Sequence, residues 1–102
     1  MNKELPSECD LRFFDTEEFA LKEPREQESI IARKSFELSA LMLKLLEVYK
    51  CAGEEKDQRK LDVTTWKLSR CVLASEECSR RLGRIVNKKL TKTVQRMKGK
   101  NE

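Results

Sequence analysis

The amino-acid sequence predicts an all-α fold, an antiparallel hairpin of two long, coiled-coil-like helices preceded by a short N-terminal helix. Charged residues make up 39% of the 102 residues and apolar residues only 38%, a balance typical of long solvent-exposed helices. Three glycines and two prolines are few turn residues for a sheet. Two long stretches carry apolar residues at helical spacing. The predicted parts are an acidic segment over 1–23, helices over 24–52 and about 58–98, a turn over 53–57 and a disordered tail over 99–102.

The acidic N-terminal segment predicts a short helix over residues 16–22. Asp15 and Glu18 have the spacing of a capping box, and Phe14 and Phe19 have the spacing of a hydrophobic staple. So short a helix needs another surface to pack on. The predicted docking residues of this segment are Phe13, Phe14, Phe19 and Leu21.

Two surfaces could receive these docking residues. One is the protein's own basic C-terminal end, where the second long helix overhangs the first and leaves Leu90, Val94 and Met97 uncovered. The other is an outside partner. The sequence leaves both open.

The first long helix shows the clearest periodicity. Its seam residues recur every seven positions and are Ile31, Leu38, Leu45 and Ala52. Pro24 suits the first turn of a helix. Gly53 is expected to end the helix, and the polar residues after it are expected to form the turn.

The second long helix has a seam of smaller residues. The seam has heptad spacing and reads Leu61, Thr64, Leu68, Cys71, Ser75, Cys78, Leu82 and Ile85. The β-branched stretch DVTTW could start a strand instead, and Ser75 could cap a separate helix. We favour one long helix, with room for a kink near Ser75. A short turn makes the two helices antiparallel neighbours.

A second apolar set lies off both seams and indicates an interaction surface, because it includes the only Trp of the chain. The predicted partner-binding residues are Phe36, Leu43, Leu46, Val63, Trp66 and Leu73. Matching of levels along the hairpin pairs them over one stretch. Self-association into a four-helix bundle and docking on other helical proteins fit equally well. Without a partner, Trp66 would fold over the hairpin edge, or the chain would be a three-helix bundle.

Charge is polarised along the chain. Residues 1–29 hold four Lys/Arg against nine Asp/Glu, a net charge of −5, and residues 79–102 hold nine against one, a net charge of +8. The predicted basic surface consists of Arg80, Arg81, Arg84, Lys88, Lys89, Lys92 and Arg96.

A basic amphipathic helix admits several functions. It can bind an acidic protein, nucleic acid or chromatin, an anionic membrane surface or a calmodulin-type protein, or leave its charges solvated on a helical bundle. The C-terminal segment contains no aromatic residue, so stacking on single-stranded bases is not expected. Of these partners, a membrane surface is not expected.

No pattern of catalytic, metal-binding or cofactor-binding residues is present. The chain has no histidine, and its four cysteines form no C-x-x-C pair, so neither a zinc site nor an enzyme is expected. Free cysteines and the lack of an apolar signal or membrane-spanning stretch predict the cytoplasm, the nucleus or both. The sequence favours a non-catalytic adaptor or structural subunit of a multi-protein assembly. The alternative is binding of nucleic acid or chromatin through the basic C-terminal helix.

Overall fold

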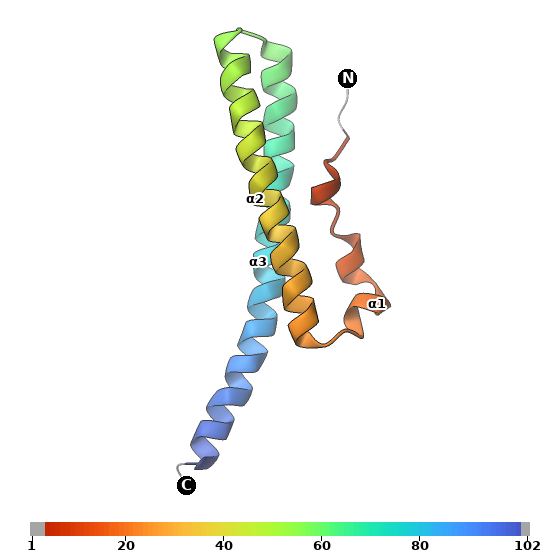
Figure 1. Ribbon diagram of the computed structural model, residues 1–102, viewed down its shortest axis with the longest axis vertical. Helices are drawn as coiled ribbons and strands as arrows, with labels where there is room; N and C mark the ends of the chain where they lie inside the picture. The colour runs from red at the N-terminus through yellow and green to blue at the C-terminus, as the bar shows by residue number, and fades with distance from the viewer. Residues whose placement is uncertain (1–3, 101–102) are drawn as a thin grey trace.

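The computed structural model describes residues 4–100 and confirms the predicted all-α hairpin. Two long helices pack antiparallel, and short elements precede them along one side (Figure 1). In chain order the elements are the 3-10 turns η1 (Ser7–Cys9) and η2 (Arg12–Asp15) and the α-helices α1 (Glu17–Ala20), α2 (Pro24–Glu54) and α3 (Gln58–Lys100). The molecule is elongated, with principal extents of 67 × 29 × 14 Å.

The core of the hairpin lies along the predicted heptad seams. The buried seam residues of α2 are Ile31, Leu38, Leu45 and Ala52, and those of α3 are Thr64, Cys71 and Cys78, joined by Ala74. The large aliphatic residues of α2 therefore meet small residues of α3, which lets the two helices interdigitate. The hydroxyl of Thr64 donates to the carbonyl oxygen of Lys60 at 2.7 Å, so the polar member of the seam is satisfied.

The turn between the helices differs from the prediction, because Gly53 lies inside α2 and the helix continues to Glu54. The residue in the left-handed conformation is Lys56, with φ of 57°. Its N–H donates to the carbonyl oxygen of Gly53 at 3.2 Å, and the N–H of Asp57 donates to that of Ala52 at 2.9 Å. These two bonds make a Schellman motif, whose geometry places the left-handed residue after the helix end.

Asp57 precedes the second long helix, which begins at Gln58. Its carboxylate accepts the N–H of Lys60 at 3.1 Å, as an N-capping residue does. From there α3 runs unbroken through the DVTTW stretch, Ser75 and Gly83. Gly99 and Lys100, which the sequence analysis assigned to the tail over 99–102, belong to α3, while residues 101–102 lie outside the described residues.

The N-terminal segment folds back along the hairpin, beside α2 and α3 (Figure 1). Helix α1 spans four residues and is shorter than predicted. Its N-cap is Thr16, whose hydroxyl oxygen accepts the N–H of Phe19 at 3.2 Å. The predicted cap, Asp15, instead pairs with Arg81 of α3 at 2.7 Å, because a guanidinium offers its carboxylate a stronger partner than a backbone N–H.

Candidate interaction surfaces

Two of the four predicted docking residues pack inside the protein itself. Phe14 and Phe19 are buried, and their ring centroids lie 5.1 Å apart. They join a core cluster with the seam residues of both long helices. Phe13 packs edge-on against Phe19 at 5.7 Å but stays partly exposed, and Leu21 is exposed. Of the four predicted docking residues, only Phe13 and Leu21 remain accessible to a partner.

Arg81 holds this N-terminal segment on α3. Its Nη2 donates to Oδ1 of Asp15 at 2.7 Å and its Nη1 to the carbonyl oxygen of Phe14 at 3.3 Å. Its Nε donates to Oε1 of Glu77 at 2.9 Å. Burial by itself would raise the pKa of Glu77, but hydrogen bonds and charges from Arg80 and Arg81 outweigh it, so the pKa lies below its ordinary value. The acidic segment therefore meets a basic residue of α3.

The N-terminal segment contacts α3 at Arg81, which is closer to the turn between the long helices than the C-terminal end that the sequence offered as one docking surface. One of the two surfaces that the sequence left open placed the phenylalanines beside Leu90, Val94 and Met97, yet these three residues remain exposed. The chain reverses between α1 and α2, and both rings join instead the core cluster that contains residues of both long helices, among them Ile31 and Cys78. A groove with two apolar walls buries more of a phenylalanine than a single helix can.

Arg81 belongs to the predicted basic surface, but sequence reasoning did not foresee its contact with the N-terminal segment. The only signal for its role was the charge contrast between the acidic segment and the basic helix. A second unforeseen contact joins Cys9 and Cys71, whose sulfur atoms lie 3.7 Å apart. Burial and the neighbouring Cys71 raise the pKa of Cys9 to about 12, so the thiol is protonated.

The predicted partner-binding residues of α2 lie on the back of that helix. Phe36 and Leu43 follow the buried Ile31 and Leu38 by five positions each, a rotation of about 140° away from the seam. Phe36 is 78% exposed and Leu43 70% exposed, and Leu46 beside them is exposed as well. These three residues form the α2 face.

The corresponding residues of α3 point away from the α2 face. Trp66 and Leu73 precede the buried Cys71 and Cys78 by five positions each, so they lie on the back of α3. Leu73 is exposed, Val63 and Trp66 are half-buried, and the guanidinium of Arg70 lies 4.2 Å from the Trp66 ring centroid. The six residues therefore occupy two faces on opposite sides of the hairpin. Partner binding by each face stays a prediction.

The C-terminal part of α3 extends past the beginning of α2 (Figure 1). Near that point Nζ of Lys89 lies 2.7 Å from Oε1 of Glu28. A stripe of exposed apolar residues, called the C-terminal stripe below, follows one side of this part of α3. It consists of Val86, Leu90, Val94 and Met97.

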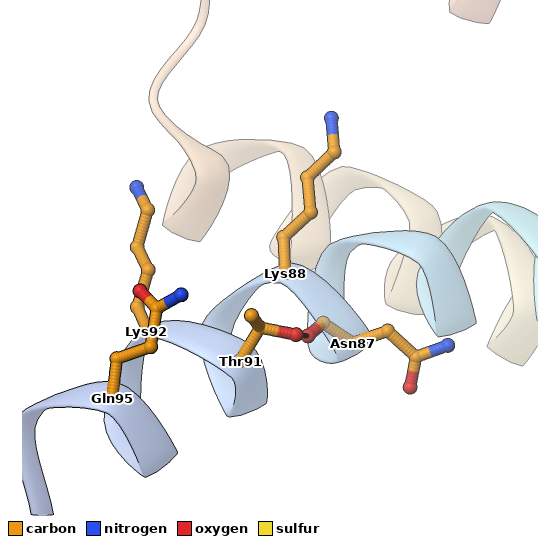
Figure 2. Close-up of a pocket in the computed structure, with 5 residues that line it drawn as sticks. All are labelled: Asn87, Lys88, Thr91, Lys92 and Gln95. Atoms are coloured by element: carbon orange, nitrogen blue, oxygen red, sulfur yellow. Dashed lines mark hydrogen bonds between the residues drawn. The ribbon is translucent and has the colours of Figure 1, made fainter. Parts of the chain in front are cut away.

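The predicted basic surface divides into paired and unpaired residues. Arg80, Arg81 and Lys89 form ion pairs with carboxylates. Within residues 4–99, the remaining four members are exposed and have no ion-pair partner; they are Arg84, Lys88, Lys92 and Arg96. Lys88 and Lys92 project to the same side of α3, and Asn87 extends to another (Figure 2). Lys88 and Lys92 also line a small pocket together with Pro24 at the start of α2.

Comparison of the chain with known protein families, with characterised proteins and with solved structures gave no match. Over the described residues, no three His, Cys, Asp or Glu side chains are grouped so that they could hold a metal ion. Within the same part of the chain, neither long helix contains an apolar stretch of the length that a bilayer span requires. The function is therefore argued from the exposed faces of the hairpin.

Proposed function

We propose that this chain is a non-catalytic helical adaptor or structural subunit of a larger multi-protein assembly, working by helix–helix packing. The observation that supports the proposal is the set of exposed apolar residues at helical spacing, on the α2 face and on the C-terminal stripe. Isolated exposed apolar residues are ordinary, but rows of them on one side of a helix mark surfaces that other helices cover.

The energetics fit association with another protein. Covering one exposed leucine or phenylalanine contributes about 1.5–3 kcal/mol. The seven residues of the α2 face and the C-terminal stripe, all at least 41% exposed, could together offset an association cost of about 4–15 kcal/mol. The molecule is only 14 Å deep along its shortest axis, which leaves little interior in which to bury them.

The test is affinity purification from the native source with the wild-type chain and three variants. Leu43→Asn and Leu90→Asn each place an amide on one apolar face, and Lys44→Asn places the same amide beside the α2 face without removing an apolar side chain. We expect Leu43→Asn or Leu90→Asn to lose at least one stoichiometric protein that Lys44→Asn retains. Identical co-purifying proteins for all four chains would refute the proposal.

One observation also supports binding of nucleic acid or chromatin as a second candidate function. The four unpaired basic residues on the C-terminal part of α3 could neutralise phosphates, and each contact would steepen the fall of log K with log salt by about 0.9. Fluorescence anisotropy of a labelled DNA duplex at two salt concentrations measures that slope. If this candidate function is right, the double variant Lys88→Gln with Lys92→Gln should lower the slope. An unchanged slope would rule out these side chains as the phosphate contacts.

A further inference from the structure

We infer that the C-terminal stripe is the docking site for an acidic amphipathic helix of a partner protein. The inference rests on the proposed adaptor function and names the chemistry of one partner.

The stripe is continuous and open. Its members are spaced by four, four and three residues, so they lie on one side of α3 over about 17 Å. Their side chains are between 41% and 59% exposed. A partner helix lying along α3 could therefore reach all four through the spacing that helices use for mutual packing.

The borders of the stripe carry only positive charge. From Arg84 to Gly99 the sequence contains six Lys or Arg residues, Arg84 included, and no Asp or Glu. At about 100° per residue, Lys89 and Arg96 border one side of the stripe and Lys98 the other, whereas Arg84 lies nearly opposite Val86. A helix on the stripe would meet basic side chains along both margins, as residues at the e and g positions of a coiled coil meet their partners. Its own margins must then be acidic.

Contacts within the chain use the same chemistry. Asp15 of the N-terminal segment pairs with Arg81 at 2.7 Å, and Glu28 of α2 pairs with Lys89 at 2.7 Å. Both segments that cover α3 near its C-terminal part thus bring a carboxylate to a basic residue. Past Lys89 the remaining basic residues have no such neighbour within residues 4–99. An acidic helix would extend this pattern along α3.

The other occupants fit less well. A second copy that paired its own stripe with this one would bring the basic margins of the two chains together, and like charges across an interface oppose association. A nucleic acid would bind the basic side chains but leave the apolar stripe in water. Only an acidic amphipathic helix uses both features.

The probe is a synthetic 21-residue helical peptide with leucine at heptad positions a and d and glutamate at e and g. Its control carries lysine in place of each glutamate. Both are labelled and titrated with the full-length protein by fluorescence anisotropy. We expect the acidic peptide to bind at least tenfold more tightly than the basic one, because only its charges complement the margins of the stripe.

Matched variants locate the site. Leu90→Asn should weaken binding of the acidic peptide at least tenfold, whereas Leu43→Asn, which removes an exposed leucine from the α2 face, should leave the Kd within about twofold. Val94→Asn serves as an independent second variant. Because both stripe residues lie outside the core, circular dichroism should show unchanged helix content.

Equal binding of the two peptides, or equal loss with Leu43→Asn and Leu90→Asn, would overturn the inference. Duplex DNA that binds regardless of Leu90 and displaces the peptide would assign the basic residues to nucleic acid. A dimer in sedimentation analysis that Leu90→Asn dissociates would assign the stripe to a second copy. Failure of the peptide experiment while Leu43→Asn still loses a co-purifying protein would leave the adaptor function standing.

Discussion

Replacement of Phe14 by alanine tests whether the N-terminal segment is part of the core. Phe14 is 6% exposed, packs on Phe19 and lies beneath the guanidinium of Arg81, 5.6 Å from its ring centroid. Removal of a buried phenylalanine side chain costs about 3–5 kcal/mol, and the position at the edge of the hairpin places Phe14→Ala near the lower end. The variant should lose about 3 kcal/mol of unfolding free energy in a urea titration followed by far-UV circular dichroism.

The chain provides a control of the same residue type. Phe36 is 78% exposed on the α2 face, so Phe36→Ala should change the unfolding free energy by no more than about 0.5 kcal/mol. Phe14→Leu keeps most of the apolar volume and should cost less than about 1.5 kcal/mol, which keeps the series measurable if Phe14→Ala is largely unfolded. A loss below about 1 kcal/mol for Phe14→Ala, or an equal loss for Phe36→Ala, would refute packing of the segment on the hairpin.

Three further predictions concern the turn, the cysteines and acid stability. Lys56→Gly should raise the unfolding free energy by up to about 1 kcal/mol, because glycine relieves the left-handed φ of 57°; Lys56→Ala should give no gain, and a gain there would exclude this cause. Diamide, an azo oxidant that accepts two electrons and two protons, should slowly join Cys9 to Cys71 and lower the protein mass by about 2 Da, a change that Cys9→Ser should prevent. Because the pKa of Glu77 is lowered in the folded state, its carboxylate stabilises the fold at pH values above its ordinary pKa of 4.5, and this stability is lost as the pH falls through the lowered pKa. Glu77→Gln should therefore flatten the acid part of a profile of unfolding free energy, measured in urea, against pH. An unchanged profile would contradict the assignment.

The spacing of apolar residues predicted the hairpin well, because in an amphipathic helix that spacing shows which side is buried. The recurrence of Ile31, Leu38 and Leu45 every seven residues required one side of a helix to be covered, and all three are buried. The smaller seam of α3 followed from the same argument. The end of α2 was not predicted, because the left-handed residue after a helix is usually a glycine and here it is Lys56.

Matching the heights of residues along the hairpin could not predict which way each apolar set faces around its helix. Matching of levels along the hairpin paired the six predicted partner-binding residues over one stretch, but burial of the seams puts those of α2 and those of α3 on opposite sides of the molecule. Height depends only on the rise per residue, whereas direction depends on which side of each helix the other one covers. The single predicted patch therefore became two faces.

The sequence by itself determined the fold class, the two seams and the contrast between an acidic beginning and a basic end, since each depends on residues close together in the chain. Only the tertiary structure decided that Phe14 and Phe19 turn inward, that Arg81 receives Asp15, and that the C-terminal stripe stays open. Those outcomes depend on a chain reversal that brings residues more than 60 positions apart into contact. A groove with two apolar walls outcompetes an exposed helix for a phenylalanine, and that groove exists only once the hairpin has formed.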